Sequence, residues 1–220
     1  MTISLDFLSV LAQWPLLATG VLWTLWLTAV AMVFGLVVAV ACARARNTGP
    51  AWIAIPVGAY VELIRNTPFI VQLFFVFFGL PAIGVRLSPA TASVIAMVLN
   101  LGAYGTEIIR AGLLATPRGQ IEAARSLALT ETQVFTRVVL PPALKRVWPA
   151  LTSQIIIVML GSAVCGQIAT EELSYAANVI SAMNFRTFES YIVATLIYLL
   201  LAIGLRRLLN WAGPRFVFGS

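Results

Sequence analysis

Long stretches without a charged side chain are the feature that most constrains what this sequence can fold into. No charged residue occurs between Asp6 and Arg44, and similar stretches recur toward the C-terminus. A helix that crosses a bilayer needs about 20 mostly apolar residues. The sequence therefore predicts an all-α membrane protein with a single transmembrane domain over residues 1–220. We expect five spans, at residues 16–42, 66–85, 87–106, 147–170 and 190–205.

The composition excludes the water-soluble classes of protein. Apolar residues make up 60% of the chain and charged residues 10%, whereas a soluble domain has about 45–50% and roughly 25%. The two cysteines, Cys42 and Cys165, lie inside apolar stretches and are typical of small core residues. Histidine, the commonest metal ligand and general base, does not occur in the sequence. We therefore expect neither a metal site nor a catalytic residue.

The beginning of the second span allows two interpretations. Residues 52–64 are also apolar, but Glu62 and Arg65 interrupt the stretch, and Pro68 cannot donate a helical hydrogen bond. Either one long helix covers residues 52–80 with a kink near Pro68, or an interfacial helix precedes a shorter span.

The distribution of basic residues predicts the orientation. Most of them follow the first, third and fifth spans, whereas the opposite loops contain only Arg86 and Arg186. By the positive-inside rule, the N-terminus lies outside and the C-terminus in the cytosol, with the first span as an uncleaved anchor. This topology accounts for the net charge of +6, so nucleic acid is not an expected partner. The basic residues on the cytosolic side are Arg44, Arg46, Arg118, Arg125, Arg137, Lys145, Arg146, Arg206, Arg207 and Arg215.

The sequence contains no nucleotide-binding P-loop. Such a loop has a glycine directly before its lysine, and the only lysine here, Lys145, follows Leu144. If the protein moves a solute against a gradient with ATP, another subunit supplies the ATP.

The one long polar interruption, residues 114–146, is predicted to form two short helices on the cytosolic side. Thr116 is the expected N-cap of the first, with Pro117 at its first position. The second begins with a capping box from Thr130 to Gln133. It presents Val134, Phe135, Val138 and Val139, and Pro141-Pro142 is expected to end it.

These apolar side chains allow two interpretations. They can pack back on the spans of their own chain. Alternatively, a helical hairpin at the membrane surface can enter a groove on a cytosolic partner.

The loop resembles the EAA loop of permease subunits from bacterial ABC importers. Glu122-Ala123-Ala124 and Leu140-Pro141 have the spacing of that family, with Ala128 at its glycine position and Val138 at its isoleucine position. Residues 65–73 and 104–112 are similar to segments of the polar amino acid permeases, with Asn66 in place of a glycine. The resemblance covers most of the chain from the second span onward.

The resemblance implies a subunit of an inner-membrane importer rather than an enzyme. Two permease subunits, identical or paralogous, would form the pathway for a polar amino acid that a periplasmic binding protein delivers. The EAA loop of each subunit would insert into an ATPase dimer, which holds the ATP and Mg²⁺. The residues implied in contact with the ATPase are Glu122, Ala123, Ala124, Ala128, Val134 and Phe135. The alternatives are a permease for another small solute and a secondary transporter.

Polar side chains within the spans are the candidates for the solute pathway, because polar groups in the hydrocarbon are costly. Asn100, Tyr104 and Glu107 share one helix face, and Glu107 is expected to pair with Arg110. For Asn100, and for Gln154 in the fourth span, the alternative is a hydrogen bond between helices. The remaining candidates are Ser162 in the fourth span and Glu172, which lies just outside it in the solvent or at the outer mouth.

Overall fold

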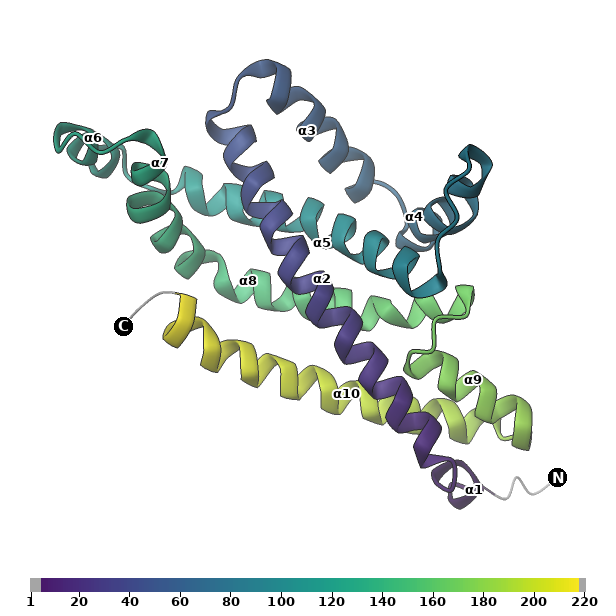
Figure 1. The fold of residues 1–220 in the computed structure, drawn as a ribbon. Helices are drawn as coiled ribbons and strands as arrows, with labels where there is room; N and C mark the ends of the chain where they lie inside the picture. The colour runs from purple at the N-terminus through teal and green to yellow at the C-terminus, as the bar shows by residue number, and fades with distance from the viewer. Residues whose placement is uncertain (1–4, 218–220) are drawn as a thin grey trace.

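The computed structural model describes residues 5–217, which form helices joined by short turns (Figure 1). The α-helices are α1 (Leu8–Leu11), α2 (Trp14–Thr48), α3 (Ala51–Arg65), α4 (Phe69–Phe74), α5 (Pro89–Leu114), α6 (Arg118–Ser126), α7 (Glu131–Gln133), α8 (Leu140–Gly161), α9 (Leu173–Asn184) and α10 (Thr187–Ala212). Wider π-helical turns cover Phe75–Gly79, Val134–Val139 and Gly213–Val217, and tighter 3₁₀ turns cover Leu80–Ile83 and Ser162–Ile168.

Four continuous helical segments are long and apolar enough to cross a bilayer, and a bent pair of helices makes up to five spans. The four are Trp14–Thr48, Pro89–Leu114, Glu131–Ile168 and Thr187–Arg215. They contain the first, third, fourth and fifth predicted spans almost entirely and extend beyond them. The prediction of an all-helical membrane protein is confirmed.

The second predicted span is a broken helix rather than a kinked one. The segments Ala51–Arg65 and Phe69–Ile83 are bent by 112° relative to each other. Pro68 lacks an N–H group and disfavours helical geometry in the residue before it, so the chain breaks at Asn66 to Pro68 instead of kinking. The interpretation as one long helix over residues 52–80 is therefore wrong.

Small residues bring α2 and α5 together in the most extensive helix contact of the fold. A Cβ atom added at Gly105 would lie 2.8 Å from Cβ of Ala39, and one added at Gly35 would lie 2.9 Å from Cβ of Leu101. Both distances are shorter than side chains tolerate, so glycine is required for this close approach. The contact fixes α5 against α2 along much of its length.

Helix α1 and the last turns of α10 lie at opposite ends of the helical bundle (Figure 1). Near the N-terminus, the N–H of Asp6 donates to Oε1 of Glu189 at the beginning of α10 (3.1 Å). At the other end, Nε1 of Trp148 in α8 donates to the carbonyl of Leu209 in α10 (3.1 Å). The end that carries α6 and the last turns of α2 and α10 is called the α6 end below.

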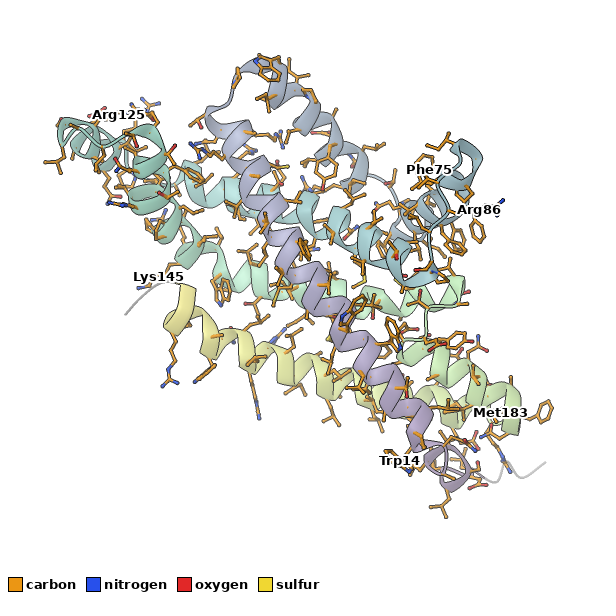
Figure 2. The ribbon with its side chains drawn as sticks, in the orientation of Figure 1. Trp14, Phe75, Arg86, Arg125, Lys145 and Met183 are labelled. Atoms are coloured by element: carbon orange, nitrogen blue, oxygen red, sulfur yellow. The ribbon has the colours of Figure 1, made fainter. Side chains whose placement is uncertain are left out.

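Large apolar side chains cover the outside of the bundle, as a bilayer requires. Trp14, Phe75 and Met183 are 66%, 69% and 61% exposed and point outward in Figure 2. Leu22 and Phe34 on α2 are exposed in the same way. Among the described residues, such side chains line the spans rather than gather in one patch, which is typical of lipid-facing surfaces.

Candidate functional site

The predicted loop between the third and fourth spans contains one separate short helix. That helix is α6, and Pro117 rather than Thr116 occupies its N-cap position, without a capping side chain. The second helix begins with the predicted capping box, in which Oγ1 of Thr130 accepts from the N–H of Gln133 (3.3 Å). The N–H of Thr130 in turn donates to Oε1 of Gln133 (2.9 Å).

The second helix does not end at Pro141-Pro142 as the sequence suggested. It passes through the π-helical turn Val134–Val139 and continues as α8. Because the α-helical hydrogen-bond pattern begins anew after this turn, both prolines lie in the first turn of α8, where a missing N–H is tolerated. The fourth span therefore begins in the loop itself.

The apolar side chains of the second helix pack on the spans of their own chain. Val134 and Phe135 are 3% and 9% exposed and share a core cluster with Ala39, Ala43 and Ile109. Ala124 of α6 joins the same cluster. The interpretation that the loop packs back thus holds for these three predicted ATPase contacts, which lie beneath the surface.

The outer side of α6 and the turn after it remain exposed. Glu122, Ala123 and Ala128 are all exposed, and Leu127 between them is 78% exposed. Leu127 was not among the predicted site residues, although a large apolar residue next to the EAA segment was the available signal. We call Glu122, Ala123, Leu127 and Ala128 the loop tip.

Several contacts hold the loop tip in place. Arg125 donates from Nε and Nη2 to the two oxygens of Glu131 (2.8 and 3.1 Å). Ala128 adopts a φ of 58°, in the left-handed region that favours glycine. The resemblance places a glycine at this position, and here alanine makes the same turn at a cost of about 1–2 kcal/mol.

A second set of contacts joins the loop to α2. Nη2 of Arg44 donates to Oγ1 of Thr132 (3.2 Å), and the guanidinium lies 4.8 Å from the ring centre of Phe135. Two residues further along α2, Arg46 pairs with Glu107 of α5. Glu107 also pairs with Arg110 (3.0 Å), as the sequence predicted.

The break between α3 and α4 gathers a second group of polar side chains. Gln72 donates from Nε2 to the carbonyls of Ile64 (2.7 Å) and Thr67 (2.9 Å), which the break leaves without helical partners. Its Oε1 accepts from Nδ2 of Asn100 on α5 (3.1 Å). Asn100 thus makes the interhelical hydrogen bond that the sequence analysis gave as its alternative role.

Tyr104 lies one turn from Asn100 and contacts the same break. Its hydroxyl donates to the carbonyl of Arg65 (3.3 Å), and the Arg65 guanidinium lies 5.7 Å from its ring centre. Arg65 forms no ion pair with Glu62, one turn earlier in α3, among residues 5–217. We call Arg65, Gln72, Asn100 and Tyr104 the polar break.

The predicted pathway residues of the fourth span lie apart from the polar break. Ser162 is buried and donates to the carbonyl of Met159 in its own helix (2.7 Å). Gln154 is 8% exposed. Across the described part of the chain, no hydrogen bond joins either of them to Asn100 or Tyr104.

Glu172 is buried, in contrast to the exposed position that the sequence analysis gave it. Its side chain caps α9, which the sequence analysis did not predict, by accepting from the N–H groups of Ser174 (2.9 Å) and Tyr175 (2.8 Å). It also accepts from the hydroxyl of Tyr198 on α10. The carboxylate therefore joins α9 to α10 and has no exposed surface.

Residues 31–218 match the protein family described as the binding-protein-dependent transport system inner membrane component. The chain belongs to this family. Among curated relatives, it is 38% identical over 186 residues to the L-cystine transport system permease protein TcyB of Bacillus subtilis, covering 84% of this chain and 80% of the relative. It is 35% identical over 199 residues to the glutamine transport system permease protein GlnP of Escherichia coli, covering 89% and 90%.

Chains of solved ABC transporter structures share the fold. A chain of the crystal structure of an amino acid ABC transporter with histidines is 35% identical, with a TM-score of 0.85 over 95% of this chain and 98% of that chain. A chain of the MetNI methionine ABC transporter in an inward-facing conformation superposes with a TM-score of 0.70 at 24% identity, over 89% and 95%. The second match supports the fold alone.

Proposed function

We propose that this family member is the transmembrane permease subunit of an ATP-driven bacterial importer for a polar amino acid. The observation that carries the proposal is the loop tip, an exposed surface at one end of the spans that combines the Glu122 carboxylate with the Leu127 side chain. The similarity to permeases named for cystine and glutamine supports the solute class.

In this proposal, the loop tip binds an ATPase subunit, and the buried half of the loop transmits force. Glu122, Ala123, Leu127 and Ala128 offer the exposed contact surface. Ala124, Val134 and Phe135 lie between that surface and the spans. The ATPase dimer holds the ATP and Mg²⁺.

The family supports the remaining partners of the proposal, and the charge distribution supports the orientation. A second permease subunit completes the pathway, and a periplasmic binding protein delivers the solute. Most basic residues lie near the α6 end, and Lys145 and Arg125 are labelled there in Figure 2. By the positive-inside rule, the α6 end and the C-terminus face the cytosol of the bacterial inner membrane, and the N-terminus faces the periplasm.

The polar break is the proposed part of the solute pathway in this subunit. It places a guanidinium, two amides and a phenol around a helix break next to the middle of α5. Such groups offer hydrogen bonds and charge to a zwitterionic solute. Gln154 of α8 and Ser162 of the 3₁₀ turn after it remain candidates for a second wall of the pathway, whereas Glu172 has a structural position.

Leu127→Asp tests the proposed function at the loop tip. Burial of a leucine side chain at an interface contributes about 1.5–3 kcal/mol, so we expect at least tenfold weaker association with the ATPase. Copurification of the ATPase with the tagged permease measures it. Phe185→Asp is the matched control, because Phe185 is 89% exposed at the opposite end of the bundle. Equal ATPase recovery with Leu127→Asp and the unchanged chain would contradict the proposal, as a secondary transporter or an enzyme would not need this partner.

Asn100→Leu tests the solute pathway. A hydrogen bond between membrane helices contributes about 0.6 kcal/mol on average. Loss of the hydrogen bond to Gln72 alone would therefore leave uptake nearly normal. If Asn100 contacts the solute, the uptake rate of labelled amino acid should fall at least about tenfold, and recovery of the ATPase should not change. Asn178→Leu, the same change at an exposed position of α9, is the control. Normal uptake by Asn100→Leu would remove the polar break from the pathway.

A further inference from the structure

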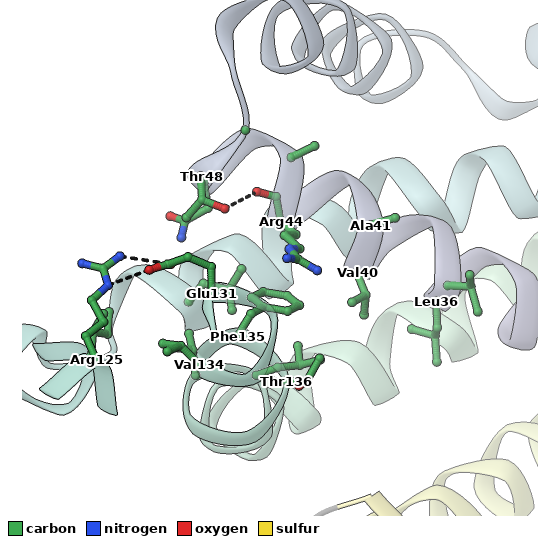
Figure 3. A pocket seen from close by; sticks show the side chains of 18 residues that line it. Leu36, Val40, Ala41, Arg44, Thr48, Arg125, Glu131, Val134, Phe135 and Thr136 are labelled. Atoms are coloured by element: carbon green, nitrogen blue, oxygen red, sulfur yellow. Dashed lines mark hydrogen bonds and ion pairs between the residues drawn. The ribbon is translucent and has the colours of Figure 1, made fainter. Parts of the chain in front are cut away.

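A large groove lies at the α6 end, between the last turns of α2 and the beginning of the fourth span (Figure 3). Its volume is about 970 Å³, and no described segment of the chain fills it. Leu113 of α5 and Ile121 and Arg125 of α6 also line it. The groove belongs neither to the loop tip nor to the polar break.

The α2 wall of the groove is apolar and continues onto the lipid-facing side of the bundle. Leu36, Val37 and Val40 line it, and Val37 is 63% exposed. One turn earlier on α2, Val33 and Phe34 are 54% and 58% exposed. An apolar strip therefore leads from the outside of the spans into the groove.

The end of the groove is polar and positively charged. The guanidinium of Arg44 lies above the ring of Phe135 in Figure 3, and one of its five N–H donors is used by Thr132. Asn47, three residues after Arg44 on α2, also lines the groove. Glu131, the only acidic residue of the lining, is paired with Arg125. The charges of the lining thus sum to one positive charge, which belongs to Arg44.

We propose that this groove binds an anionic phospholipid of the leaflet at the α6 end. An acyl chain lies along Leu36, Val37 and Val40, and the phosphate accepts hydrogen bonds from Arg44 and Asn47. Charge complementarity selects an anionic headgroup, because the uncompensated cation lies at the end of the apolar strip. The identity of the transported solute does not enter the proposal, which needs only that the spans lie in a bilayer.

The bound lipid would contact the loop as well as the spans. Arg44 also holds Thr132 and Phe135, so a phosphate on its free donors would fix a side chain that already joins α2 to the loop. A lipid bound in the groove would thus stiffen the connection between α2 and the loop.

Photolabelling in vesicles tests the proposal with the assembled importer, including its ATPase. The probe is a phosphatidylglycerol with a diazirine on one acyl chain, added to phosphatidylcholine vesicles. We expect labelling of peptides that contain residues 36–41 and 134–139, with displacement by unlabelled phosphatidylglycerol and not by phosphatidylcholine. Arg44→Gln should lower the labelling about fivefold, which corresponds to about 1 kcal/mol for one arginine near an anionic surface.

Two further variants separate binding from damage to the fold. Ala41→Trp fills the groove from an exposed position of its lining without removing a charge, and it should abolish the labelling. Arg118→Gln removes a charge from exposed α6 outside the groove and should leave labelling unchanged.

Equal displacement by phosphatidylcholine, or unchanged labelling in Arg44→Gln, would overturn the proposal. Labelling of the isolated chain that disappears in the assembled importer would overturn it too, since the ATPase would then fill the groove. Uptake assays report on the proposed function separately.

Discussion

Replacing Glu122 with arginine is expected to abolish amino acid uptake while the protein still inserts into the membrane. Glu122 is exposed on α6, and its side chain forms no ion pair among the described residues. The fold therefore does not depend on its charge. The proposed function puts this carboxylate at the ATPase contact, where charge reversal would cost about 2 kcal/mol or more, a roughly 30-fold weaker interaction.

The measurement is uptake of labelled amino acid in parallel with ATPase turnover. We expect uptake at background, with the ATPase either lost from the complex or hydrolysing ATP without transport. Glu171→Arg makes the same charge change at an exposed position at the other end of the fourth span and should transport normally. Normal uptake by Glu122→Arg would refute the role of the loop tip.

Replacing Glu172 with alanine is expected to destabilise the protein strongly. Three donors would lose their acceptor: the N–H groups of Ser174 and Tyr175 and the hydroxyl of Tyr198. Each buried donor left unsatisfied costs about 1–3 kcal/mol, so the loss is about 3 kcal/mol or more. Such a loss is a large part of the 5–15 kcal/mol that typically stabilises a folded protein.

Thermal unfolding of the purified protein in detergent measures this loss. Glu171→Ala removes the neighbouring carboxylate, which is exposed, and should change stability by no more than about 0.5 kcal/mol. A Glu172→Ala protein as stable as the unchanged chain but inactive in uptake would contradict the structural role. It would instead favour the position at the outer mouth that the sequence suggested.

The spans were predictable because hydrocarbon imposes one simple condition, an apolar stretch of sufficient length. The break at Asn66 to Pro68 was only partly predictable. Proline indicates an interruption, but the freed carbonyls are satisfied by the side chain of Gln72, which in turn accepts a hydrogen bond from Asn100 on α5. Such partners are distant in sequence and leave no periodic pattern.

The loop shows the same division between local and tertiary determinants. The capping box was predictable because it involves only Thr130 and Gln133, three residues apart. The burial of Val134 and Phe135 depends on α2 and α5, which no local pattern reveals. Glu172 was misplaced for a related reason, because its partner Tyr198 lies 26 residues away on another helix.

The continuity of the loop with the fourth span has a mechanical consequence. The helical segment Glu131–Ile168 has 38 residues, so at about 1.5 Å per residue it is far longer than the roughly 30 Å hydrocarbon layer. A push on its protruding end would tilt the helical segment about the point where it leaves the lipid. The far end, which carries Ser162 and leads to Glu172, would then swing in the opposite direction.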